Sequence, residues 1–346
     1  MKPIYLLILI SGIGLFSCKT KSVSVKVLKP AEIYIPSNIK TLAVVNRSLP
    51  AKGNGNQFNN VVEGIFSGEG LFVDREASQR TVSGLADGLQ NSPRFEITVP
   101  DGLDLRGTGT AKFPTPLEWS KVEQICKNYS ADALILLETF DSNTSKRFGS
   151  QQKTRKEDNR DVTYTEYKAT IDISVNAGWR IYDPENHKII DQNVFVDRKA
   201  WNRTGRTKTE AQNNLPKQAY AVKDAGYFAG KRYAVRISPN WIWVSRHYYV
   251  KANDDFKDAK YKVDAKRWED AAEIWKLYVN DPDFKIAGRA CYNMALASEI
   301  LGKFDIALNW AQKAYADYHL KDALQYINIL ENRIRDAERL DQQMNN

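Results

Sequence analysis

The sequence has very few of the side chains that most often bind metal ions or act as nucleophiles. It contains 3 cysteines, 3 histidines and 3 methionines among 346 residues. His187, His247 and His319 lie far apart and have no cysteine or carboxylate at the spacing of a zinc site. A Gly-x-Ser-x-Gly segment and the local signature of a cysteine enzyme are also missing. We therefore expect no cofactor, no metal and no enzymatic activity, although abundant carboxylates leave a glycosidase-type pair open.

Long apolar runs are also missing, with one exception at the start of the chain. The run from Ile4 to Phe16 is shorter than the about 20 residues that a membrane-spanning helix needs. One positive charge at Lys2, a short apolar run and a small residue before a cleavage point are typical of a secretory signal. The sequence therefore predicts a signal peptide over residues 1–17, followed by a flexible tether over residues 18–39.

The predicted signal ends in Leu15-Phe16-Ser17-Cys18, which resembles the lipobox of bacterial lipoproteins. The resemblance implies that Cys18 is acylated, for instance with palmitate, and becomes the first residue of the mature chain. Multiple acyl chains on one cysteine anchor a protein stably in a bilayer. Lys19 follows the cysteine, where an aspartate would change sorting, and no acidic cluster of the surface-export kind comes next. The expected location is the outer membrane, with the protein facing the periplasm.

Acidic residues are fewer than basic ones, 42 against 50, which gives a formal net charge of +8. The basic residues are spread along the chain, so nucleic acid is not an expected partner, whereas weak attraction to an anionic lipid surface fits this charge. Cys126 and Cys291 each lie in an apolar helical pattern of a different predicted domain. They are expected as buried free thiols rather than as a disulfide.

Two segments of the C-terminal part share one pattern. Residues 268–275 and 304–311 each begin with an aromatic side chain and have alanine at the fourth position, little more than the ~34-residue tetratricopeptide period apart. This pattern resembles the tetratricopeptide-repeat family over about residues 254–318. The resemblance implies antiparallel helix pairs with small residues in their seams and a glycine at a helix end. The residues expected to carry this packing are Trp268, Ala271, Ala295, Gly302, Phe304, Ala307 and Ala314.

The end of the chain continues the helical pattern. Apolar residues recur at three- and four-residue spacing from Leu320 to Leu340, which predicts one more amphipathic helix. We expect this helix to cap the repeats, so that residues 251–346 form an all-α module. Repeats of this kind bind protein partners more often than they catalyse reactions.

Residues 40–250 are predicted to form an α/β domain in which strands and helices alternate. Such alternation favours a sheet with parallel strands. The polar segment from Ser142 to Arg160 is expected as a mobile loop, and residues 209–235 are expected as a helix that Pro216 interrupts. The other expected strands cover residues 40–46, 95–99 and 131–138, and the other expected helices cover residues 78–89 and 116–129.

The longest strand pattern runs from Tyr167 to Ile181, where every odd position is apolar and most even positions are polar. A turn at residues 183–186 follows, and residues 189–199 return as the antiparallel partner. We expect one face of this hairpin to pack on helices. The alternative is a pore-forming hairpin, because about 10 alternating residues suffice to cross a membrane. Polar residues on both faces of the returning strand argue against that alternative.

An aromatic segment closes the α/β domain at residues 240–250. Core packing of a final strand is the main expectation, because Trp and Tyr side chains bury large areas. A ligand groove in which Arg246 and His247 supply the polar groups is the alternative.

The order strand, helix, strand, helix, strand, long hairpin, helix, strand resembles a lipoprotein group that includes the curli secretion channel and the N-terminal domain of the Tol-system protein TolB. With the lipobox and the repeats, the whole chain resembles an uncharacterised lipoprotein family of Bacteroidota. The expected fold is α+β, with an α/β domain that has a mixed sheet and a long β-hairpin, followed by the all-α module. The expected role is a protein-binding scaffold or adaptor. A subunit of an envelope export assembly and an unrecognised hydrolase are the alternatives.

Overall fold

The computed structural model describes residues 20–50, 68–90, 92–109 and 111–345. These residues divide into two compact units that do not follow the order of the chain. Unit 1 combines the chain up to Val27 with Trp241–Glu338, and unit 2 comprises Leu28–Asn240 with Arg339–Asn346. The predicted signal peptide and Cys18 lie outside the described residues. Every described helix is too short or too polar to cross a bilayer.

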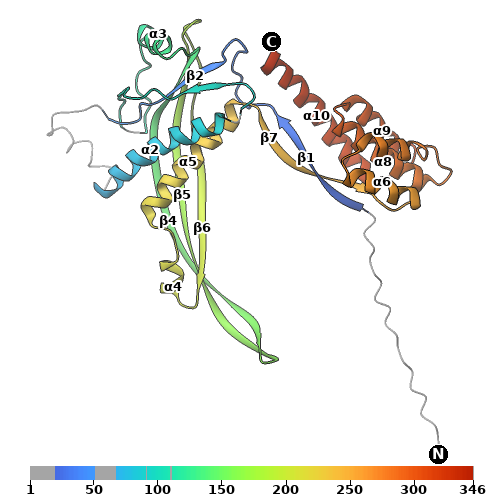
Figure 1. Cartoon of the computed structure of the whole chain (residues 1–346). Coiled ribbons are helices and arrows are strands. Elements are labelled where there is room, and N and C mark those ends of the chain that lie inside the picture. The colour runs from blue at the N-terminus through green and yellow to red at the C-terminus, as the bar shows by residue number, and fades with distance from the viewer. Residues whose placement is uncertain (1–19, 51–67, 91, 110, 346) are drawn as a thin grey trace, which may run out of the picture. The chain divides into compact units, whose positions relative to one another are not determined.

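Unit 2 is built on a five-stranded mixed sheet with the strand order β3-β2-β4-β5-β6 (Figure 1). The central strand β2 (Thr41–Asn46) runs parallel to β3 (Glu96–Thr98) on one side and to β4 (Ala133–Glu157) on the other. β5 (Arg160–Asp183) and β6 (Lys188–Gly205) extend the sheet in antiparallel fashion. The predicted mixed sheet with a long hairpin is therefore confirmed.

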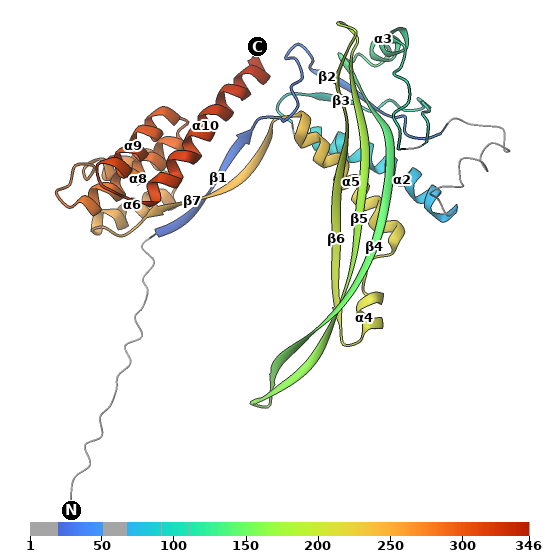
Figure 2. The same cartoon turned by 180° about the vertical axis from the view of Figure 1, so that it is seen from behind.

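Helices cover both faces of this sheet (Figure 1, Figure 2). α2 (Gly68–Leu89) and α5 (Gln218–Ile237) lie side by side on one face, and α3 (Trp119–Asn128) lies on the other. Successive side chains of a strand point to opposite faces, so Leu42 and Val44 of β2 pack on the first pair while Ala43 and Val45 pack on α3. The short helix α4 (Lys208–Asn213) precedes α5, and Pro216 lies in the gap between them, as expected.

The alternating segment of β5 packs its apolar face against α5. Ile171, Ile173 and Trp179 are 1%, 0% and 0% exposed and belong to one apolar cluster with Tyr233 of α5. The rings of Trp179 and Tyr233 stack with centroids 4.6 Å apart. The expectation that this face packs on helices is confirmed, and these positions therefore do not face lipid.

The segment Ser142 to Arg160 is not a loop. β4 continues to Glu157 and pairs with β5 throughout, and beyond Ser150 the two strands form a two-stranded ribbon. The ribbon extends past the last pair between β5 and β6, which joins Tyr167 to Gly205. Side chains on both of its faces are solvent-exposed, so no apolar alternation marks the strands. The prediction was wrong because a strand whose side chains are mostly exposed to solvent has the polar composition of a loop.

Unit 1 combines a two-stranded sheet with the helices at the end of the chain. β1 (Thr20–Lys29) pairs with β7 (Asn240–Tyr249). The apolar cluster of the unit joins β7 to all of its helices. These helices are α6 (Asp254–Asp264), α7 (Trp268–Lys276), α8 (Phe284–Ile300), α9 (Phe304–Ala316) and the part of α10 (Asp322–Asn345) up to Glu338.

The predicted flexible tether is folded from Thr20 onward. Val23 packs against the cluster of unit 1, and Val27 is 2% exposed. Farther along, Ile35 and Ile39 are buried in unit 2. The prediction was wrong because the partner of β1 lies more than two hundred residues away, so no hairpin turn marked the alternating valines.

Candidate functional site

Helix α8 carries a row of side chains that are buried although three of them are polar or charged. Arg289, Tyr292, Asn293 and Glu299 are 8%, 3%, 0% and 3% exposed. Their spacing places them on one side of the helix, which we call the α8 face. The α8 face is occupied by the chain's own residues 246–251, at the end of β7 and just after it.

The α8 face binds the backbone of this segment. Asn293 accepts a hydrogen bond from the Tyr249 N–H through Oδ1 and donates one to the Tyr249 carbonyl through Nδ2, each at 2.8 Å. Arg289 donates from Nη1 to the carbonyl oxygen of Lys251. Main-chain hydrogen bonds of this kind give affinity for an extended chain, whereas side-chain pockets give specificity.

Glu299 holds the other end of the segment by its side chain. Arg246 donates from Nη2 to Oε1 at 2.8 Å and from Nε to Oε2 at 2.9 Å, a bidentate geometry stronger than a single neutral hydrogen bond. Burial acts to lower the pKa of Arg246, but Glu299 outweighs it and raises that pKa. The Tyr326 hydroxyl of α10 donates to the same carboxylate at 2.8 Å. Burial and then Glu299 raise the pKa of Tyr326, so its hydroxyl remains a donor.

Two more side chains of the segment are fixed individually. The His247 ring stacks on Tyr292 with centroids 5.1 Å apart, and its Nε2 lies 2.8 Å from the Tyr292 hydroxyl. The Tyr249 hydroxyl donates to Oδ2 of Asp322 at 2.6 Å. Burial is the main reason that the pKa values of Tyr292 and Tyr249 are raised. Both hydroxyls therefore stay protonated and neutral.

The intervening residue Tyr248 points to the opposite side. Its ring lies 6.4 Å from Trp268 and 6.2 Å from Trp275, measured between centroids. Burial raises the pKa of Tyr248 to about 12. Because alternate residues of an extended chain face opposite ways, the segment is held from both sides.

The thiol next to the α8 face is not activated. Cys291 is a free thiol on α8, and its Sγ lies 3.6 Å from the carbonyl oxygen of Val279. Burial raises the pKa of Cys291 to about 12, so the thiol is neutral and a poor nucleophile. In the described ranges, no group of three or more His, Cys, Asp or Glu side chains is placed to hold a metal ion.

The expected repeat residues lie around this site. Gly302 has φ 75° directly after α8, where a residue with a Cβ would be strained. Phe304 is half-buried, and the Arg333 guanidinium lies 4.9 Å from its ring centroid. Trp268 packs at the margin of the same apolar cluster. The alanines at the helix seams, Ala271, Ala295, Ala307 and Ala314, are all 0% exposed.

The α8 face itself was missed by sequence reasoning. Asn293 and Glu299 stand among small apolar residues in a helix that is buried on every side. A buried polar side chain needs a partner, and that need was the available signal. No local pattern indicated that the partner is the backbone of Tyr249, because this residue lies 44 residues earlier in the chain.

Neither expectation for the aromatic segment 240–250 describes the whole segment. Tyr248 and Tyr249 are buried, but Trp241 and Trp243 are 50% and 69% exposed, so core packing was right only for the second half. The groove alternative was wrong for Arg246, whose guanidinium is bound to Glu299 rather than free for a ligand. The start of β7 stays exposed because β7 pairs with β1 alone instead of joining the large sheet.

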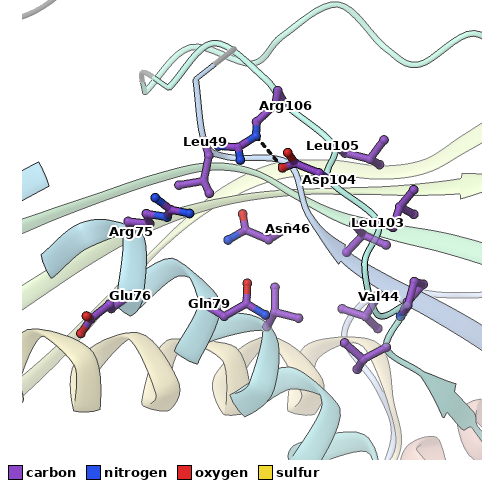
Figure 3. Close-up of a pocket in the computed structure, with 14 residues that line it drawn as sticks. Val44, Asn46, Leu49, Arg75, Glu76, Gln79, Leu103, Asp104, Leu105 and Arg106 are labelled. Atoms are coloured by element: carbon purple, nitrogen blue, oxygen red, sulfur yellow. Dashed lines mark ion pairs between the residues drawn. The ribbon is translucent and has the colours of Figure 1, made fainter. Parts of the chain in front are cut away.

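A second candidate site is a cavity of about 370 Å³ in unit 2 (Figure 3). It lies at the carboxyl ends of the parallel strands β2 and β3, and Asn46, Pro100 and Gln79 line it. The chain leaves β2 toward α2 on one face of the sheet and leaves β3 toward α3 on the other. Such a switch point is where open α/β sheets bind ligands. This cavity is the candidate small-molecule site.

The charged groups of this cavity are largely paired with one another or with neighbours. Arg106 forms an ion pair with Asp104 at 2.6 Å, drawn as a dashed line in Figure 3. Glu76 forms an ion pair with Lys223 at 2.7 Å, and Asn46 donates to the Ser78 hydroxyl at 2.9 Å. Most charged groups at the cavity are therefore already paired within the protein and are not free to bind a ligand.

A buried carboxylate also stands inside unit 2. Glu138 is 0% exposed and lies 2.8 Å from Nη1 of Arg180 and 3.1 Å from Nη1 of Arg47. The two arginines also donate to the carbonyls of Pro114 and Thr115, respectively. This network fastens the connection after β3 to the sheet, so its role is structural.

Two family models match this chain. The model described as "Domain of unknown function (DUF8603)" matches residues 39–249. The chain belongs to this family. A second model, described as "Domain of unknown function (DUF6340)", matches residues 257–332. The first match ends at residue 249, within the segment 246–251, and the second begins at residue 257. Arg246 and Tyr249 therefore lie in the first region, and the helix that binds them lies in the second.

Comparisons with single proteins add little. No curated protein matches the chain. Among solved structures, a neuraminyllactose-binding hemagglutinin homologue from Helicobacter pylori is similar over 60% of this chain and 88% of that chain, at 11% identity and a TM-score of 0.24. A score this low supports no inference about fold or function.

Proposed function

We propose that this chain is a non-enzymatic scaffold or adaptor that binds protein partners through its C-terminal helices. In this proposal, an acylated Cys18 anchors it in the outer membrane, facing the periplasm. The observation that carries the proposal is the double hydrogen bond between Asn293 and the backbone of Tyr249. It supports the proposal because these helices already hold an extended polypeptide by its main chain.

The proposal includes a tetratricopeptide-type arrangement of α6 to α9. In its favour, the seams between these helices contain the buried alanines Ala271, Ala295, Ala307 and Ala314. Small residues there let paired helices approach closely. Gly302 then ends α8 in the left-handed conformation that a sharp reversal requires.

Exposed apolar side chains favour unit 1 as the part that meets a partner. Of the exposed large apolar side chains in the described chain, eight lie in unit 1 and seven in unit 2, although unit 1 is the smaller unit. Single exposed apolar residues need no explanation, but a high density of them is typical of an interaction surface. Leu277 and Phe284, on either side of the α7–α8 connection, are 75% and 59% exposed. The others in this unit are Trp241, Trp243, Tyr261, Ile306, Tyr315 and Leu324.

Site-specific photocrosslinking in intact cells tests the proposal. A photoreactive amino acid at Leu277 is expected to give a discrete protein adduct. The matched control is Val196 of unit 2, which is also apolar and 54% exposed, and it is expected to give no such adduct. Identical adducts at both positions, or none at either, would contradict a role for the helices in partner binding.

A second candidate function is a subunit of an envelope export assembly, and one observation favours it. The ribbon formed by the end of β4 and the start of β5 has no third strand in the described chain beyond Tyr167. Isolated two-stranded ribbons are marginally stable in water, so contact with another subunit would stabilise it. Native mass spectrometry of the detergent-extracted protein decides between a ring and a monomer.

A further inference from the structure

The two-stranded sheet of unit 1 has one exposed face with an unusual composition. Along β1 the side chains at 22, 24 and 26 are exposed, and along β7 those at 241, 243 and 245 are exposed. Lys26 lies over the Trp241 ring, 5.0 Å from its centroid, so these two rows share one side. We call this side of the β1–β7 sheet the ribbon face; it is distinct from the ribbon formed by β4 and β5. Its members are Ser22, Ser24, Lys26, Trp241, Trp243 and Ser245.

The opposite side of this sheet is occupied. Val23 of β1 packs against the apolar cluster of unit 1, whereas the indoles of Trp241 and Trp243 remain 50% and 69% exposed. Indole has an apolar body and an N–H donor, which suits the boundary between lipid and water. Two indoles two residues apart on one side of a strand can enter that boundary together.

The charge of both strands has a single sign. Among the cations of these strands, Lys26 lies on the ribbon face, whereas Lys21 pairs with Asp264 and Arg246 with Glu299. Neither strand contains an aspartate or glutamate. The Lys26 ammonium beside two exposed indoles, on a face whose members include no carboxylate, is complementary to the headgroups of anionic lipids.

The place of this face in the chain brings it near the proposed anchor. Ser22 and Ser24 follow Cys18 by four and six residues, which at full extension is at most about 14 and 22 Å. The start of β1 also lies next to the end of β7, because Lys21 forms an ion pair with Asp264 of α6 at 2.6 Å. A lipid on Cys18 would therefore hold the ribbon face within reach of the headgroups.

We propose that the ribbon face is a contact surface for an anionic bilayer, which it touches through Trp241, Trp243 and Lys26. This inference rests on the proposed lipid anchor at Cys18. The anchor supplies most of the membrane affinity, and the ribbon face orients unit 1 against the lipid surface.

A polarity-sensitive fluorophore on the ribbon face tests this inference. The full, lipid-anchored chain with Ser24→Cys is labelled in vesicles of phosphatidylglycerol. Cys126 and Cys291 are buried, so the introduced thiol is the accessible one among the described cysteines. The emission is expected to shift to the blue, and a label at Gln312→Cys, on the exposed side of α9, is expected to show no shift.

Three outcomes would overturn the inference. The label at Ser24 could keep its water-like emission on vesicles that carry the protein. The label at position 312 could show the same blue shift as the label at position 24. The label at position 24 could shift without lipid as protein concentration rises, which would place a second copy of the chain on this face.

The anchor and the ribbon face are separated by flotation with the same vesicles. The Cys18→Ala chain is expected to float weakly, and adding Trp243→Ser should weaken its vesicle affinity about tenfold, because binding follows the buried apolar area. Leu277→Ser, an exposed apolar position in the same unit, should leave the affinity unchanged. Anchored protein that floats with an unshifted Ser24 label would refute the ribbon face and retain the anchor. A full chain with Cys18 intact that does not float would refute both.

Discussion

The side-chain amide of Asn293 satisfies both backbone groups of Tyr249, with an N–H···O distance of 2.8 Å in each direction. Asn293 is 0% exposed, so water cannot replace either bond. Leaving a buried polar group without its partner costs about 1–3 kcal/mol. The end of β7 and helix α8 therefore stabilise each other, although two different family models cover them.

Asn293→Leu should lower the free energy of unfolding of the full chain by about 2–3 kcal/mol, because the N–H and carbonyl of Tyr249 lose their partners. Urea denaturation followed by tryptophan fluorescence measures this loss. Asn309→Leu, on the exposed side of α9, is the control and should change little. An unaltered midpoint for Asn293→Leu would mean that the segment is not held by α8.

Ala307→Arg should disrupt the helical part of unit 1. Ala307 is 0% exposed within the apolar cluster, so a long charged side chain there costs about 3 kcal/mol or more unless it escapes to solvent. Circular dichroism during heating reports the effect, with Gln312→Arg on the same helix as the control. If both variants melt like the wild type, the proposed repeat packing is incorrect.

Ile173→Asp should destabilise unit 2 because Ile173 is 0% exposed beneath α5. Burying an unpaired carboxylate costs about 3–5 kcal/mol. Thr163→Asp, at an exposed position of the same strand, provides the comparison in thermal melts. An export-pore role predicts the reverse, with Ile173→Asp sparing stability and abolishing membrane conductance.

Cys18→Ala should release the protein from the membrane into the periplasm, because the predicted acylation site is lost. Labelling of cells with a clickable fatty acid, followed by fractionation, tests this. The wild type is expected to carry the label and to remain with the outer membrane. A mutant that is as fully membrane-bound as the wild type, or a wild type that is never labelled, would refute the anchor.

Asp74 gives the stability of unit 2 a specific pH dependence. Burial raises its pKa to about 6; a 2.5 Å hydrogen bond from the Ser142 hydroxyl opposes this, and the charge of Asp141 adds to it. The native state therefore binds a proton more tightly than the unfolded state, and its stability falls as pH rises from about 4 to about 6. Asp74→Asn removes this loss.

The stability difference between Asp74→Asn and the wild type should therefore grow in favour of the variant between pH 4 and pH 7, by about 1–2 kcal/mol after allowance for partial solvent screening. Denaturation curves at several pH values measure it. A difference that stays constant with pH would show that Asp74 has an ordinary pKa.

The elements that could be predicted from the sequence are those whose local packing imposes a periodic pattern of apolar and polar residues. The period of two from Tyr167 to Ile181 reports a strand with one buried face, and the structure buries that face. Pro216 likewise marked the gap between α4 and α5. In these cases the physical cause of the structure is local, so a short stretch of the sequence is enough to recognise it.

Elements whose cause lies elsewhere in the chain were not predictable. β1 is a strand because β7 pairs with it, and the residues of β4 beyond Ser150 are a strand because β5 pairs with them, although their side chains are exposed to solvent. The site on α8 depends in the same way on Tyr249 and Arg246, which precede it by 44 and 53 residues. Pairings over such distances leave no local period in the sequence.

The pairing of β1 with β7 has a consequence for biogenesis. A chain that emerges from its N-terminus presents β1 first, but the partner strand begins only at Asn240. The residues of the unit 2 core all precede that point, so this core can form first. Until β7 is present, the backbone N–H and C=O groups of β1 lack their strand partner. An unpaired strand edge of this kind recruits other strands. The hazard of aggregation is therefore greatest in chains interrupted shortly before residue 240.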